Sequence, residues 1–189
     1  MRAIVGLGNP GPEYTETRHN AGFRLADHLL ARWRLGPLRR GERARVAEGS
    51  WNGQTIRIVE PQTYMNRSGA AIAPLLDLPG FDPSRDLLIL LDEVALPLGR
   101  FRLRGAGSAG GHNGLKSVEG VLRRQDYARL RIGVGPRPAG LDELSDYVLD
   151  TFAREEREVL DGLLDPMADA VETWVDEGIE IAMTRHNRS

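Results

Sequence analysis

The sequence predicts a single-domain α/β protein, with a mixed, mostly parallel sheet and helices packed on both of its faces. Strand-like apolar runs alternate with amphipathic helical segments along the chain. The run LLILL at 87–91 is continuously apolar, which is typical of a central strand covered on both faces. The length of 189 residues fits one domain, and we expect residues 1–189 to form it.

The individual elements follow from local signals. The apolar residues 3–7 predict a short buried strand, followed by a loop rich in glycine and proline. Asn20 can cap a helix over residues 21–30, whose apolar side chains recur near helical spacing. The Asn52-Gly53 pair predicts a hairpin turn. The other expected elements are hairpin strands at 43–51 and 54–60, a helix at 68–76, strands at 87–91 and 99–104, a helix at 114–124, a strand at 128–134, and helices at 141–149 and 153–183.

Composition excludes several classes of protein. The chain has no cysteine, which excludes disulfide scaffolds, zinc fingers, iron–sulfur sites and thiol catalysis. No apolar run reaches the length of about 18 residues that a membrane-spanning helix needs. The first residues lack the apolar stretch and cleavage site of a secretory signal. We therefore expect a cytoplasmic protein that does not enter a membrane.

Charge is divided unevenly along the chain. Residues 1–140 carry 21 Lys and Arg against 13 Asp and Glu, whereas residues 141–189 carry 4 against 14. Arginine supplies 24 of the 25 basic residues, and it binds phosphate in a bidentate manner. A GC-rich genome also enriches arginine, so the uneven charge along the chain is stronger evidence than the arginine content. It predicts a polyanionic partner on one face.

The segment GLGNPG at 6–11 satisfies the G-x-G-x-x-G pattern of dinucleotide-binding folds. In those folds the third glycine opens a helix whose free N–H groups bind the pyrophosphate. Prolines at positions 10 and 12 remove two of these donors, and the polar segment that follows delays the helix. A tight structural turn remains an alternative. We favour a site loop that brings Asn9, Tyr14, His19 and Asn20 to the carboxyl end of the first strand.

His19 and Asp92 form a candidate pair of general base and orienting carboxylate. Both are expected at carboxyl ends of strands, where open α/β sheets bind their ligands. A buried carboxylate fixes the tautomer of an imidazole and supports its role as a base. Each residue also has a structural interpretation, because Asp92 could cap a turn and His19 could be a packed histidine. His112 lies in a glycine-rich loop and competes with His19 for the role of base.

Other reaction classes find little support in the motifs. The sequence has no Walker loop and no H-E-x-x-H metal motif, and AGSAG at 106–110 departs from the G-x-S-x-G pattern. The remaining chemistry is a histidine base acting on water, with no metal. Amides at Asn66 and Asn113 are suited to orient a water, a carbonyl or a ribose hydroxyl. Tyr14 and Tyr64 could stack on a base or ribose, or could be half-buried packing residues.

Arginines alternate along two of the expected strands. Arg100, Arg102 and Arg104 share one face of their strand, and Arg129 and Arg131 share a face of another. This spacing matches a phosphate backbone. The alternative is a solvated edge strand protected against aggregation.

Taken together, five segments resemble the bacterial-type peptidyl-tRNA hydrolases. They are GLGNPGPEYTETRHNAGF at 6–23, PQTYMNRSG at 61–69, LLILLDE at 87–93, GSAGGHNGLKS at 107–117 and RLRIGVG at 129–135. They occur in the order and with the spacing of that family. The resemblance implies hydrolysis of the ester between a peptide and the terminal ribose of tRNA, which recycles the tRNA from prematurely released peptidyl-tRNA. It also implies a cytoplasmic monomer with no cofactor, no metal and no obligate protein partner.

The resemblance also implies roles for individual residues. It makes His19 the base that activates water, Asp92 the carboxylate that keeps it basic, and Asn9 the contact to the peptide of N-blocked substrates. The residues that match positions linked to the acceptor end of the tRNA are Tyr14, Tyr64, Asn66 and Asn113. Arg104 and Arg131 match a basic pair that grips the 5′-phosphate. One departure is Ala95, which stands where relatives commonly carry a second aspartate.

Overall fold

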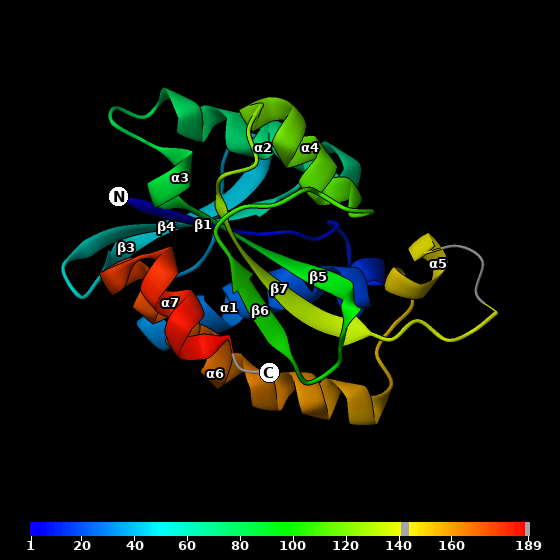
Figure 1. Cartoon of the computed structure of the whole chain (residues 1–189). Coiled ribbons are helices and arrows are strands. Elements are labelled where there is room, and N and C mark those ends of the chain that lie inside the picture. The colour runs from blue at the N-terminus through cyan, green and yellow to red at the C-terminus, as the bar shows by residue number, and fades with distance from the viewer. Residues whose placement is uncertain (141–143, 188–189) are drawn as a thin grey trace.

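The computed structural model describes residues 1–140 and 144–187, and its centre is a seven-stranded sheet in the order β2-β3-β4-β1-β5-β7-β6 (Figure 1). The strands are β1 Arg2–Gly6, β2 Arg39–Arg40, β3 Ala44–Trp51, β4 Gln54–Pro61, β5 Leu87–Pro97, β6 Phe101–Arg104 and β7 Ala128–Gly135. The four central strands β4, β1, β5 and β7 run parallel. The outer pairs β2–β3, β3–β4 and β6–β7 are antiparallel. This arrangement confirms the mixed, mostly parallel sheet.

Helices cover both faces of the sheet (Figure 1). They are α1 Ala21–Trp33, α2 Ser68–Ile72, α3 Pro83–Asp86, α4 Asn113–Leu122, α5 Leu144–Val148, α6 Arg154–Glu177 and α7 Ile179–His186. Alternate residues of each central strand face opposite cores, so Ile4 packs toward α1 and α6 whereas Ala3 and Val5 pack toward α2 and α4. Among the described residues, no helix is both long enough and apolar enough to cross a membrane.

Several elements differ from the sequence-based prediction. The helix expected at 153–183 is two helices, because Gly178 adopts a positive φ of 88° between α6 and α7. The helix expected at 68–76 ends at Ile72 and continues as a 3₁₀ turn, Ala73–Asp77. The short strand β2 was not predicted. The first residues of the helix expected at 141–149, residues 141–143, lie outside the described part of the chain.

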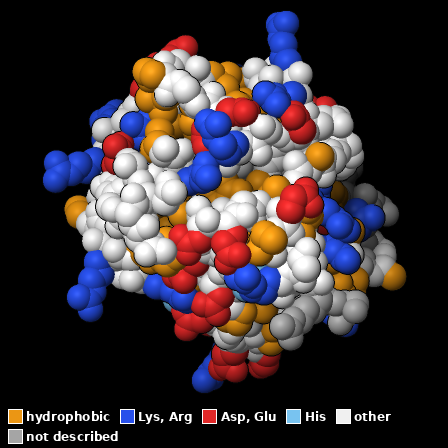
Figure 2. Space-filling model, turned by 60° about the vertical axis from the view of Figure 1, so that its left-hand side comes forward, with side chains coloured by type: hydrophobic (Ala, Val, Ile, Leu, Met, Phe, Trp, Pro, Cys, Tyr) orange, Lys and Arg blue, Asp and Glu red, His pale blue; other side chains and the backbone are white. Residues whose placement is uncertain are grey.

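Some of the acidic side chains after residue 140 are paired with α1, because α6 packs on α1. Arg32 of α1 bonds to the carboxylates of Asp169, at 2.6 Å, and Glu172, at 3.1 Å, on α6. His28 is paired with Asp165 at 2.7 Å. Figure 2 shows basic and acidic side chains interspersed on one face of the molecule. Part of the acidic excess after residue 140 is therefore paired with Arg32 and His28 of α1.

The start of α1 lies directly against the strand ends, which positions the candidate site. A Cβ on Gly22 would come within 2.6 Å of the carbonyl oxygen of Leu7, and a Cβ on Gly6 would come within 2.5 Å of the carbonyl oxygen of Gly22. This close approach needs glycine at both positions. It brings the 3₁₀ turn Arg18–Asn20, which precedes α1, next to β5.

Candidate functional site

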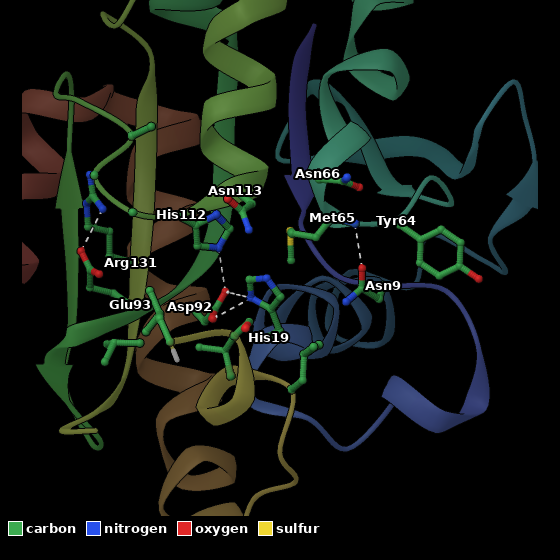
Figure 3. Close-up of a pocket in the computed structure, with 18 residues that line it drawn as sticks. Asn9, His19, Tyr64, Met65, Asn66, Asp92, Glu93, His112, Asn113 and Arg131 are labelled. Carbon is green, nitrogen blue, oxygen red and sulfur yellow. Dashed lines mark hydrogen bonds and ion pairs between the residues drawn. The ribbon is translucent and has the colours of Figure 1, made fainter. Parts of the chain in front are cut away.

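A cavity of about 450 Å³ opens at the carboxyl ends of the parallel strands (Figure 3). Its polar wall comes from the loops after β1 and β4, from β5 and from the start of α4, and its apolar wall comes from α5. The lining residues are Asn9, His19, Tyr64, Met65, Asn66, Asp92, Glu93, Val94, residues 109–113, Arg131, Leu144, Ser145, Val148 and Leu149. The loop after the first strand and the end of the central strand thus meet at one cavity, as the sequence predicted.

His19 and Asp92 contact each other inside this cavity. The Nδ1 atom of His19 lies 2.9 Å from Oδ2 and 3.0 Å from Oδ1 of Asp92. Since a carboxylate only accepts hydrogen bonds, Nδ1 carries the proton and donates it. Nε2 of His19 then holds a lone pair, and it points away from Asp92 into the cavity (Figure 3). A lone pair directed into a cavity can accept a proton from a bound water.

Asp92 is ionised although it is buried. Only 2% of the residue is exposed. Burial alone raises the pKa of a carboxyl group, but electrostatic interactions and hydrogen bonds with His19 and His112 outweigh burial and hold the pKa of Asp92 below its usual range. The carboxylate therefore stays negative where it contacts both imidazoles, and it can stabilise a proton that His19 gains.

His112 is also bound to Asp92, and its second nitrogen is already occupied. Nε2 of His112 lies 2.8 Å from Oδ1 of Asp92, and Nδ1 accepts the backbone N–H of Leu115 at 3.2 Å. This second bond makes His112 the N-cap of α4. With one nitrogen accepting and the other donating, His112 has no lone pair for a substrate proton. The geometry thus favours His19 over His112 as the base.

Asn9 is held rigidly between two loops. Its Oδ1 accepts the backbone N–H of Met65 at 2.7 Å. Asn20 binds the backbone of Asn9 twice, accepting from its N–H at 2.9 Å and donating to its carbonyl at 3.0 Å. Asn20 was expected to cap α1, but its side chain makes no capping bond and binds Asn9 instead. These contacts leave Nδ2 of Asn9 turned toward the cavity (Figure 3).

The remaining predicted contact residues divide between the cavity and its surroundings. Asn66 and Asn113 line the cavity, and so does Tyr64, which is 56% exposed at its rim. Tyr14 is not a lining residue. Its ring packs edge-on against Tyr64, with 6.3 Å between the ring centres. Tyr14 therefore supports Tyr64 from outside the cavity.

The residue types around Asp92 are ones that bind metal ions. His19, Asp92 and His112 offer ligand atoms that all lie within 4.8 Å of one another. In the structure these atoms are joined by hydrogen bonds, so a metal would have to displace the protons on two imidazole nitrogens.

Comparison with known proteins identifies the family. The family model described as peptidyl-tRNA hydrolase matches residues 3–189. The chain belongs to the peptidyl-tRNA hydrolase family.

Similar sequences and structures agree with this assignment. The peptidyl-tRNA hydrolase of Gemmatimonas aurantiaca is 46% identical over 190 residues, which is 100% of both chains. That of Chloroflexus aggregans is 47% identical over 187 residues and 99% of both chains. A crystal structure of the peptidyl-tRNA hydrolase from Acinetobacter baumannii superposes with a TM-score of 0.91 at 34% identity, covering 99% of this chain and 94% of that one.

The arginines that the peptidyl-tRNA hydrolase resemblance singled out occupy different environments. Arg131 lines the cavity, and its guanidinium is paired with Glu93 at 2.9 Å. Arg104 lies exposed on β6, outside the cavity lining. The strand register places Arg102 directly opposite Arg131. Arg102 and Arg104 therefore share a face with Arg131 next to the cavity.

Arg129 does not lie on the surface that the other arginines of β6 and β7 share. It is fully buried, and its guanidinium donates to the carbonyl oxygens of Gly107 at 2.9 Å and Gln125 at 2.7 Å. It also lies 4.1 Å from the ring centre of Tyr127. Because its donors are taken by backbone carbonyls, its role is to anchor the glycine-rich loop to β7. The strand pattern alone could not separate it from Arg131.

One buried residue of the site was missed by sequence reasoning. Arg18 bonds to the carbonyl oxygen of Tyr147 at 3.1 Å and to Glu156 at 3.0 Å, so it attaches the loop of His19 to the α5 segment. A signal existed, because Arg18 directly precedes His19, but an arginine in a polar loop is ordinarily solvated.

Proposed function

We propose that this protein hydrolyses the ester bond between the carboxyl end of a peptide and the 3′-terminal ribose of tRNA, with His19 as a general base and without a metal or cofactor. The observation that carries the proposal is the bond from His19 Nδ1 to Asp92, which leaves Nε2 free toward the cavity. Membership of the peptidyl-tRNA hydrolase family supplies the substrate class.

The reaction needs one water and two proton transfers. Nε2 of His19 removes a proton from the water while the water oxygen attacks the ester carbonyl carbon. The carbonyl π electrons move onto oxygen, and Asp92 stabilises the imidazolium that forms. The tetrahedral intermediate then collapses, the bond to the ribose oxygen breaks, and His19 returns the proton to that oxygen. The products are a free peptide acid and tRNA with its ribose hydroxyl restored.

The asparagines at the cavity supply neutral hydrogen bonds. Asn66 and Asn113 line its wall, and an amide can donate to an oxyanion and accept from a water or hydroxyl. In the proposal they orient the water and the leaving ribose oxygen or stabilise the oxyanion. Asn9 binds the peptide through Nδ2, because its Oδ1 is already occupied by Met65. This contact selects a substrate with a blocked amino group over free aminoacyl-tRNA.

The tRNA side of the substrate lies on the exposed rim in this proposal. Tyr64, supported by Tyr14, offers a ring face to the acceptor end. Arg131 and Arg104 take the 5′-phosphate, and Arg131 would exchange part of its pairing with Glu93 for the phosphate. The same proposal includes a cytoplasmic monomer that recycles tRNA from prematurely released peptidyl-tRNA and needs no protein partner.

The test is release of free tRNA from N-acetyl-aminoacyl-tRNA, with unblocked aminoacyl-tRNA assayed in parallel. We expect cleavage of the blocked substrate only, and we expect it to continue after dialysis against a chelator. Asp92→Asn should abolish most turnover, because an amide can donate to Nδ1 and thereby place the imidazole proton on Nε2. His28→Ala is the matched control, since His28 lies on α1 and is paired with Asp165 outside the cavity.

Three outcomes would count against the proposal. Salt-sensitive binding of tRNA without cleavage would indicate an RNA-binding protein. Loss of activity on chelation, restored by a metal, would indicate that the cluster of His19, Asp92 and His112 holds a metal. Equal cleavage of both substrates would remove the role of Asn9 in selecting the blocked amino group.

A further inference from the structure

The outer edge of strand β6 is hydrogen-bonded by the side chain of Asn187. In the sheet β6 pairs with β7, and Leu103 lies in the middle of the strand. The Oδ1 atom of Asn187 accepts the backbone N–H of Leu103 at 2.8 Å, and Nδ2 of Asn187 donates to the carbonyl oxygen of Leu103 at 2.8 Å. One side-chain amide therefore satisfies both outward backbone groups of Leu103, as a neighbouring strand would.

Asn187 is itself firmly held. Its backbone N–H donates to the carbonyl oxygen of Met183 at 3.0 Å, which makes it the C-cap of α7. The helix lies alongside β6 (Figure 1), with Ala182 fully buried in the core that also contains Leu103. His186, one residue earlier, contacts Thr173 of α6 at 2.8 Å. Asn187 thus joins the end of a packed helix to the edge of the sheet.

The backbone that Asn187 holds carries two arginines. Arg102 and Arg104 flank Leu103, and their side chains point to the opposite face from the buried side chain of Leu103. Arg102 lies opposite Arg131 in the ladder with β7. A four-residue edge strand bonded on one side frays more easily than one bonded on both sides. Fixing Leu103 therefore limits the positions of Arg102 and Arg104 relative to Arg131.

We propose that Asn187 is a positioning residue for recognition of the tRNA 5′-phosphate, and that it acts by holding β6 so that Arg104 reaches the phosphate together with Arg131. This inference rests on the phosphate-binding role of Arg104 and Arg131 proposed above. Asn187 makes no contact with the catalytic cavity, so it affects substrate affinity and leaves the chemical step unchanged.

The experiment measures kcat and KM of Asn187→Ala with two substrates, N-acetyl-aminoacyl-tRNA that carries its 5′-phosphate and the same tRNA treated with phosphatase. We expect KM for the phosphorylated substrate to rise about five-fold with kcat within about two-fold, and KM for the dephosphorylated substrate to stay constant. Thr184→Ala is the matched control, because Thr184 is an exposed residue of α7 that bonds within its own helix. In an Arg104→Ala background, Asn187→Ala should have little further effect.

Other results overturn the inference in distinguishable ways. If Asn187→Ala lowers the melting temperature and leaves both KM values unchanged, Asn187 has only a structural role. If Arg104→Ala does not change the preference for the 5′-phosphate while hydrolysis persists, the phosphate site itself is wrong. Asn187→Asp is a second variant that tests the inference if the alanine variant does not fold. Its carboxylate still accepts from Leu103 N–H but cannot donate to the carbonyl, so it should also raise KM for the phosphorylated substrate, and a wild-type KM would contradict the inference.

Discussion

The guanidinium of Arg18 lies 4.1 Å from the centre of the Tyr147 ring and donates a 3.1 Å hydrogen bond to the Tyr147 carbonyl oxygen. The hydroxyl of Tyr147 in turn donates to the carbonyl oxygen of Val134 at the end of β7, at 2.6 Å. Residues before and after Tyr147 form the apolar wall of the cavity. Arg18 therefore connects the turn that carries His19 to the wall that faces it.

Arg18→Lys is expected to weaken this connection. An ammonium group cannot bond to both Tyr147 and Glu156 while stacking on the ring, so the α5 wall should loosen. We expect kcat/KM to fall about ten-fold, with faster hydrogen exchange in α5. Arg157→Lys is the control, since the guanidinium of Arg157 makes a long contact of 3.5 Å to Glu16 on the surface. Unchanged kcat/KM in Arg18→Lys would mean that the wall is held by other contacts.

His112 is expected to affect catalysis through Asp92. Its removal takes away one of the two imidazoles that are hydrogen-bonded to the buried carboxylate. A hydrogen bond to a charged group is worth roughly 1.5–3 kcal/mol, so kcat should fall at least about ten-fold in His112→Ala. His112→Asn keeps a favourable helix cap, and it should lose activity while retaining its melting temperature. Full activity in His112→Asn would show that the cap, and not the contact to Asp92, is what His112 contributes.

Glu60 should make the free energy of unfolding fall with rising pH. Burial first, and then a hydrogen bond to Asp27, raise the pKa of Glu60 from 4.5 to about 10. Between these values the folded chain binds a proton that the unfolded chain has lost. The contribution of Glu60 to the free energy of unfolding is therefore full below pH 4.5 and is lost as the pH rises toward about 10. Glu60→Gln removes this proton uptake.

Thermal unfolding of Glu60→Gln at several pH values checks this sign. We expect its melting temperature to match the wild type near pH 5 and to exceed it by a growing margin toward pH 9. Glu48→Gln, a change at a half-exposed carboxylate paired with Arg57 in the same hairpin, should keep the wild-type slope. Parallel slopes in wild type and Glu60→Gln would contradict the assignment of a buried proton to Glu60.

Gly22→Ala tests how the fold places the turn of His19. The added methyl group would collide with the carbonyl oxygens of Leu7 and Leu90, so the start of α1 would have to move. We expect a loss of about 1–3 kcal/mol in the free energy of unfolding, measured by denaturant titration, together with reduced activity. Gly162→Ala lies in α6 with open space around it and should be stabilising by roughly 0.5–1 kcal/mol. If Gly22→Ala were equally stabilising, the close approach of helix and sheet would not be required.

The strands of the sheet could be predicted from the sequence because a continuous apolar run indicates a buried strand. The LLILL run became the central strand β5, and the order of polar loops after strands put Asn9, His19 and Asp92 at one edge. The break at Gly178 was missed because amphipathic spacing continues on both sides of it, so only the backbone conformation reveals it.

Side-chain roles were less predictable than positions. His112 resembled a second candidate base until its bond to Leu115 showed which nitrogen was occupied. Arg129 and Arg131 alternate identically along β7, yet carbonyl oxygens of a distant loop bury one of them. The link from Asn187 to Leu103 spans 84 positions and leaves no local pattern in the sequence. Contacts of this kind depend on tertiary packing, which a periodicity does not encode.

The most direct test of the central claim is to measure turnover and tRNA affinity of His19→Ala side by side. Loss of the imidazole whose Nδ1 is bound to Asp92 and whose Nε2 faces the cavity should lower kcat for N-acetyl-aminoacyl-tRNA by at least about 10²–10⁴-fold. The dissociation constant for uncharged tRNA should change less than about three-fold, because His19 is 8% exposed and the proposed tRNA contacts lie on the rim. If affinity falls in parallel with turnover, His19 binds tRNA and is not the base that activates water.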